Sequence, residues 1–324
     1  MRDRETLGSA GLIAVTSALA VTLWCARRKA RRTPPNGRAA RSVAALHPGK
    51  PLEVHAAQRL NRSSGLLAAS VLADSALEHY RGAFQNRAMF APLAASLLSL
   101  LAGGHGLQDE RRGAHRLRHI VYWGAAGTGL LGTAFHLYNV GSRPGGWTWP
   151  NLFYGAPIGA PAALILSGLL GACAEQVRDA APGREPSVFG LPAGRGLAAV
   201  VAAGLLGTTG EAGLLHFRGA FHNPAMWLPV TLPPAGAALL GQAAVGSVRR
   251  NRWFTRVWLR ATALIGFGGS AFHAYGVSRN MGGWRNWRQN ILNGPPLPAP
   301  PSFAGLALAG LAALLLLEDE PDVR

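Results

Sequence analysis

A block of fourteen residues that occurs twice constrains the fold of this chain more than any other feature. His79–Pro92 reads HYRGAFQNRAMFAP and His216–Pro229 reads HFRGAFHNPAMWLP, so nine of fourteen positions are identical at an offset of 137 residues. The same offset relates Ala134–Tyr138 to Ala271–Tyr275 and Gly145–Trp147 to Gly282–Trp284. Because separate elements share one offset, the sequence predicts a tandem duplication, and residues kept in both copies are those that the shared architecture needs.

The apolar segments of the chain predict a membrane protein. Only 15% of the 324 residues are charged and 49% are hydrophobic, whereas a soluble chain carries about 25% charge. A helix of about 20 apolar residues crosses a bilayer. Segments of suitable length and composition are residues 8–26, 60–80, 88–103, 118–140, 156–174, 196–217, 225–246, 257–277 and 302–317. The sequence therefore predicts an all-α integral membrane fold with about nine transmembrane helices.

These segments divide into one N-terminal anchor helix and two tandem four-helix repeats. The predicted boundaries are an anchor and basic linker over residues 1–62, repeat 1 over 63–178, a linker over 179–194, repeat 2 over 195–318 and a tail over 319–324. Each repeat has an even number of spans, so both copies face the same way, as parallel repeats about an axis along the membrane normal.

The distribution of basic residues predicts the orientation. Placing the N-terminus outside and the C-terminus in the cytoplasm puts 23 of the 32 Lys and Arg residues in cytoplasmic segments, as the positive-inside rule requires. This places the protein in the plasma membrane, which is the inner membrane in a bacterium. It also explains most of the net charge of +17 without a nucleic-acid partner.

Four of the ten histidines occur as matched pairs, namely His79, His136, His216 and His273. The predicted topology places all four at one depth, near the outer ends of the first and third helices of each repeat. Paired histidines on facing helices of a bundle are suited to axial ligation of haem b. A non-haem transition metal is the alternative ligand. In a third interpretation the histidines are structural residues at the membrane interface.

Two carboxylates inside the spans, Asp74 and Glu211, are also related by the 137-residue offset. A charged carboxylate in the bilayer costs at least about 2.5–3.5 kcal/mol, so each needs a partner or a proton. We expect them to be metal ligands, proton acceptors or supports for the histidines. Arg81 and Arg218 follow the histidines by two residues and are candidates for clamping a haem propionate, a quinone-like head group or a lipid phosphate.

The connection between the first and second helix of each repeat has a predicted local structure. Gly82 and Gly219 are expected to allow a tight turn, and Asn86 and Asn223 to cap the next helix. The outer segments contain arginines but, apart from Asp3 and Glu5, no acid. This positive face favours an anionic substrate or an acidic partner.

The leading functional hypothesis is a membrane redox protein that carries electrons between an extracytoplasmic dehydrogenase and a quinone. Intramembrane carboxylates and parallel repeats also favour a proton- or ion-coupled transporter or a solute-binding membrane protein. A structural membrane anchor for a larger complex is the third hypothesis. The chain contains no phosphate-binding loop, hydrolytic triad or zinc-protease motif, so the sequence leaves open whether it is an enzyme.

Overall fold

The structure, a computed structural model, describes residues 51–246 and 252–318, and these are almost entirely helical. The predicted anchor helix, most of the basic linker and the tail at 319–324 lie outside the described residues. In chain order the elements, with η for a 3-10 helix, are α2 (Leu52–Arg81), η2 (Arg87–Phe90), α3 (Ala91–Gln108), α4 (Arg116–Gly141), α5 (Trp149–Tyr154), α6 (Gly159–Arg178), β1 (Ser187–Val188), β2 (Leu191–Pro192), α7 (Ala193–Arg218), η3 (Pro224–Trp227), α8 (Leu228–Val245), α9 (Arg252–Arg279), η5 (Gly283–Asn286), α10 (Trp287–Asn293) and α11 (Pro301–Glu318).

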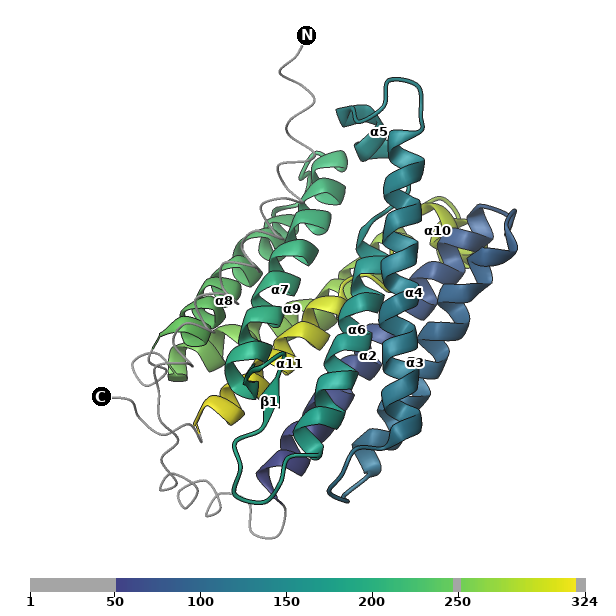
Figure 1. Ribbon diagram of the computed structural model, residues 1–324. Helices are drawn as coiled ribbons and strands as arrows, with labels where there is room; N and C mark the ends of the chain where they lie inside the picture. Colours follow the sequence, from purple (N-terminus) through teal and green to yellow (C-terminus); the bar gives the residue numbers. More distant parts are fainter. Residues whose placement is uncertain (1–50, 247–251, 319–324) are drawn as a thin grey trace.

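The eight long helices pack as two four-helix groups (Figure 1). In the first group α2, α3, α4 and α6 form a ring in which each helix contacts the next, so α2 and α4 are diagonal. The second group has the same order, α7, α8, α9 and α11, with α7 and α9 diagonal. The groups join where α11 packs on α2 and α6 packs on α7.

Glycines allow close helix packing in both groups. A Cβ added to Gly129 of α4 would lie 2.7 Å from the carbonyl oxygen of Pro161 in α6. A Cβ on Gly266 of α9 would lie 2.6 Å from the backbone nitrogen of Ala304 in α11. The third and fourth helices of each group therefore pack backbone against backbone.

The described helices are apolar enough to belong in a membrane. Five are long and apolar enough to cross one, in the spans Arg87–Gln108, Gly159–Arg178, Ala193–Arg218, Pro224–Val245 and Pro301–Glu318. Large apolar side chains lie on the outside of other helices, among them Leu130 and Phe135 of α4 and Phe267 of α9, each more than half exposed. A soluble protein rarely exposes so much contiguous apolar surface. The chain is thus an all-α protein with membrane-like helices.

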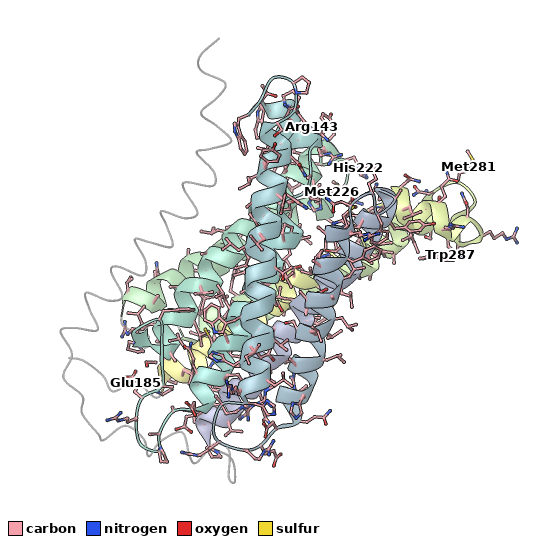
Figure 2. The ribbon with its side chains drawn as sticks, turned by 45° about the vertical axis from the view of Figure 1, so that its right-hand side comes forward. Arg143, Glu185, His222, Met226, Met281 and Trp287 are labelled. Atoms are coloured by element: carbon pink, nitrogen blue, oxygen red, sulfur yellow. The ribbon has the colours of Figure 1, made fainter. Side chains whose placement is uncertain are left out.

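The two ends of the bundles differ in their short elements. Helices α5 and α10 lie at the end that the sequence predicts to be outer, while the β1–β2 hairpin lies at the opposite end (Figure 1). Figure 2 labels Arg143, His222 and Trp287 toward the outer end and Glu185 toward the other.

Helix α2 begins at Leu52, earlier than the start at residue 60 that the sequence predicts. This start lies inside the segment 1–62 that was predicted to be anchor and linker. Val54, Ala57 and Leu60 are completely buried, and Ala57 and Leu60 belong to the main core. This burial explains why the helix extends so far toward the N-terminus.

Candidate functional site

The first-helix histidines of both groups have the same hydrogen-bonding state. His79 Nδ1 lies 2.6 Å from the carbonyl oxygen of Met89, and His216 Nδ1 lies 2.8 Å from that of Met226. A carbonyl oxygen can only accept, so Nδ1 carries the proton in both rings. In the neutral ring, this tautomer leaves the lone pair on Nε2.

The third-helix histidines follow the same rule. His136 Nδ1 donates to the carbonyl oxygen of Pro157, and His273 Nδ1 donates to that of Pro296 over 2.6 Å. His79 interacts electrostatically with His136, and His216 interacts with His273. Each first-helix histidine thus lies within electrostatic range of the third-helix histidine of its own group.

The turn after His79 differs from the prediction in which residue takes the unusual backbone conformation. Gly82 has an ordinary φ of −78°, while Ala83 and Phe84 have φ of 54° and 47°. The glycine lies close to Met89, because a Cβ on it would be 3.2 Å from Met89 Cε. The left-handed residues turn the Phe84 ring, which stacks on Phe90 and meets the edge of His79.

The second copy of this turn has the same geometry. Ala220 and Phe221 have φ of 55° and 47°, and Phe221 stacks on Trp227. The predicted caps are confirmed in both copies, since the side chains of Asn86 and Asn223 each accept a backbone N–H at 2.9 Å. The block shared by the two copies thus encodes one local structure that positions a histidine.

The carboxylate of Glu211 contacts the opposite group. It lies against Gly159, the first residue of α6, since a Cβ on that glycine would lie 2.8 Å from Glu211 Cγ. Gly159 lies two residues after Pro157, whose carbonyl holds His136. Glu211 of the second group is therefore next to the segment that positions the histidine of the first group, and it lies at the positive end of the α6 dipole.

Asp74 lies near Glu211 and Glu78, close enough to interact electrostatically with both. Among residues 51–246 and 252–318, no group of three or more His, Cys, Asp or Glu side chains could hold a metal ion. The predicted set of four histidines with both carboxylates is thus not assembled around one point within these residues.

The two candidate clamping arginines have different surroundings. Arg81 forms an ion pair with Glu78 at 2.5 Å. The counterpart of Glu78 in the second copy is Leu215. Arg218 instead lies over the rings of Phe153 and Tyr154, 5.8 and 5.3 Å from their centroids.

A buried ionic network at the opposite end of the first group was missed by sequence reasoning. Arg118 donates to both carboxylate oxygens of Glu175, at 2.8 and 3.0 Å, and to Asp109 at 2.8 Å. Burial opposes the ionisation of Asp109, but hydrogen bonds from Arg118 and Arg111 outweigh it and hold the pKa of that carboxyl well below its usual range. Arg178 is completely buried and donates to backbone carbonyls, including that of Gly106 at 2.9 Å.

Polar contacts continue from this network into the first group. Tyr122 donates to the side-chain oxygen of Asn61 at 2.5 Å. Ser64 and Ser167 donate to each other's backbone carbonyls at 2.8 and 2.9 Å, and Ser99 contacts Ser167 at 2.9 Å. All five side chains are buried.

Comparing the copies position by position would have revealed these residues. The offset is 137 residues through α4 and α9 and becomes 139 after the loop, because Asn151 and Pro157 match Asn290 and Pro296. With these offsets, each polar residue of the first copy corresponds in sequence to an apolar residue of the second. The pairs are Asn61 and Ala198, Ser64 and Val201, Tyr122 and Leu259, Ser167 and Leu306, Glu175 and Leu314, and Arg178 and Leu317.

No protein family, curated protein or solved structure matches this chain.

Proposed function

We propose that this chain is an integral membrane redox protein that binds haem b at one or both histidine pairs, His79 with His136 and His216 with His273. The observation that carries the proposal is the shared state of the four rings: Nδ1 faces a backbone carbonyl in each, which leaves Nε2 free to ligate. A ligating histidine almost always donates its other ring N–H in this way. Two imidazoles from facing helices are a known axial ligand set for haem.

Each residue of the candidate site has a defined role in this proposal. The carbonyls of Met89 and Pro157 fix the tautomer and the orientation of the first pair. Glu211 holds the segment that bears Pro157. A haem held by two imidazoles supplies one-electron transfer at the outer end of the protein. Imidazole also suits iron, copper or zinc without haem, so metal content is measured alongside the spectrum.

The proposed architecture has nine spans, with the two four-helix groups as parallel repeats. Helices α2, α4 and α9 contain 30, 26 and 28 residues, and about 20 residues cross a bilayer. The N-terminus lies outside and the C-terminus in the cytoplasm, in the inner membrane of a bacterium. Electrons pass from an extracytoplasmic dehydrogenase to a quinone. Arginines at the outer end, such as Arg143 and Arg285, support an acidic partner there.

The test is an oxidised-minus-reduced visible spectrum of the detergent-purified protein, with total metal analysis on the same sample. We expect Soret and α bands, and the haem-to-protein ratio reports whether one or both pairs are occupied. His79→Ala and His273→Ala should each remove the haem of their own pair. His222→Gln is the matched control, because it changes an outer histidine into the residue that the first copy carries as Gln85.

Two results contradict the redox proposal. One is a wild-type protein with neither haem bands nor stoichiometric metal. The other is unchanged cofactor content in both His79→Ala and His273→Ala. Stoichiometric metal without haem bands would identify a non-haem metal centre at the same histidines in place of haem.

A second candidate function is proton- or ion-coupled transport. The observation in its favour is the proximity of Asp74 and Glu211, two carboxylates from the first helices of the two groups. Paired carboxylates inside a membrane protein commonly bind a proton or a cation. In proteoliposomes with an internal pH indicator, this function predicts ion-dependent uptake that is lost in Asp74→Asn and Glu211→Gln. Equal signals from both variants and the wild type contradict it.

A further inference from the structure

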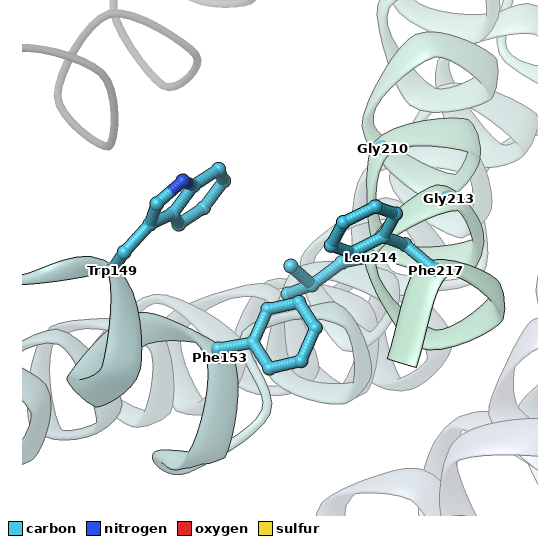
Figure 3. A pocket seen from close by; sticks show the side chains of 6 residues that line it. All are labelled: Trp149, Phe153, Gly210, Gly213, Leu214 and Phe217. Atoms are coloured by element: carbon cyan, nitrogen blue, oxygen red, sulfur yellow. The ribbon is translucent and has the colours of Figure 1, made fainter. Parts of the chain in front are cut away.

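A cavity of about 290 Å³ lies between α5 and α7 at the predicted outer end (Figure 3). Trp149 and Phe153 of α5 form one side, and Leu214 and Phe217 of α7 form the other. Phe153 and Phe217 meet edge to face, with ring centroids 5.8 Å apart. The walls are therefore aromatic and apolar, which suits a flat apolar ring.

Two glycines of α7 create the space. Gly210 and Gly213 line the cavity. A Cβ on Gly210 would meet no heavy atom within 4 Å, and one on Gly213 would make only an ordinary contact, 3.6 Å from Val230. Methyl groups at both positions would thus project into open space and reduce the cavity without a clash.

An arginine lies at the edge of this cavity. The guanidinium of Arg218 is 5.8 Å from the centroid of Phe153, which is part of the wall. Among the residues that the structure describes, Arg218 makes no ion pair, in contrast to its counterpart Arg81 with Glu78. A ligand here meets an apolar ring pocket and a cation that can donate to an oxygen.

The equivalent place in the other copy has different residues. There α10 packs on α2, and Ala73 and Ala76 occupy the positions of Gly210 and Gly213. Arg288, the counterpart of Trp149 in the register set by Asn151 and Asn290, binds the hydroxyl of Tyr80 and lies over its ring. The two copies therefore differ in the groups that meet at this place, two aromatic rings beside two glycines in one copy and an arginine–tyrosine contact beside two alanines in the other.

We propose that the cavity between α5 and α7 binds the ring of a membrane quinone, with a quinone oxygen next to the Arg218 guanidinium. The aromatic walls accept the ring and the glycines make room for it. Arg218, which forms no ion pair among the described residues, recognises its oxygen. The evidence for the cavity is its geometry, whereas the choice of a quinone rests on the redox function proposed above.

The test is photolabelling of the purified full-length protein with an azido-benzoquinone that carries a ten-carbon tail, followed by identification of the labelled peptides. We expect labelling of residues 149–154 and 210–218. An unlabelled quinone with the same tail should compete, and the ten-carbon alcohol should not. Gly210→Ala with Gly213→Ala, which installs the residues of the first copy, should weaken quinone binding at least about tenfold. Gly207→Ala, one turn away and also facing open space, should change it less than twofold.

The glycine variants separate lost binding from lost folding, because alanine in a helix is favoured over glycine by about 0.5–1 kcal/mol. The proposal is overturned if the double variant binds the quinone as the wild type does, or if label spreads over the outer aromatic residues of both copies. Equal competition by the alcohol identifies an acyl-chain site and also overturns it. Labelling at the cavity in haem-free protein refutes the redox function alone, and haem without such labelling refutes the cavity site alone.

Discussion

Removal of one partner from the buried Arg118–Glu175 pair should destabilise the protein strongly. The two side chains are 2% and 0% exposed and share two hydrogen bonds, at 2.8 and 3.0 Å. In Glu175→Leu the guanidinium keeps only Asp109 as a charged partner. Breaking a buried pair from one side costs about 3–5 kcal/mol. At about 2–4 °C per kcal/mol for a domain of 150–250 residues, the melting temperature should fall by roughly 6–20 °C.

Removal of both partners should cost less than the sum of the two single removals. Replacing a buried pair by apolar residues of similar size is often neutral or even stabilising. The second copy already carries such a residue, since Leu314, the counterpart of Glu175, is 1% exposed in the core. Arg118→Met combined with Glu175→Leu should therefore recover part of the loss, with a coupling energy of about 2–3 kcal/mol in the double-mutant cycle.

Thermal unfolding of the purified variants in detergent, followed by tryptophan fluorescence, measures these differences. Arg256→Met is the control, because Arg256 pairs with Glu318 but is 39% exposed, and an exposed pair contributes under about 1 kcal/mol. The reasoning is refuted if Glu175→Leu costs no more than Arg256→Met. It is also refuted if the double variant loses the sum of the two single losses.

Three further predictions concern local contacts. Gly159→Ala places a Cβ 2.8 Å from Glu211 Cγ, so it should cost about 1–3 kcal/mol by overpacking, and Glu211→Ala in the same chain should relieve the loss measured by thermal unfolding. Asn223→Ala removes the cap of η3 and should cost about 1 kcal/mol, whereas Asn223→Asp should keep most of it. The lowered pKa of Asp109 means that its stabilising charge is fully present above the unfolded pKa of about 4 and is lost as pH falls further. Melting temperatures between pH 7 and 3 should fall below about pH 5 in the wild type and fall less steeply in Asp109→Asn.

The sequence predicted the features that depend on local chemistry or on the apolar period. The caps at Asn86 and Asn223 follow from an acceptor side chain in front of free backbone N–H groups. The pairing of each first-helix histidine with its third-helix partner, which rests on their shared offset, stays a prediction.

Features that depend on tertiary contact could not be read from one sequence. Gly82 was expected to allow the tight turn, but the residues with positive φ are Ala83 and Phe84. The cause is tertiary, because Met89 lies close to Gly82 and the ring of Phe84 packs against His79. Likewise Glu211 lies five residues before His216 yet holds the start of α6 in the other group. Only the packing of α6 on α7 reveals that contact.

The differences between the copies are not scattered over the structure. The shared residues form the outer turns and hold the histidines, while the interior of the first group is polar where that of the second is apolar. A cavity lies at Gly210 beside α5, whereas in the other copy Arg288 of α10 contacts Tyr80. A duplication kept only for stability has no reason to bury Glu175 and Arg178, because Leu314 and Leu317 fill the same places without the cost of desolvating charge. The copies therefore share one helix arrangement but differ in their interiors and at the outer end. Experiments on function should begin at the cavity and at the ionic network.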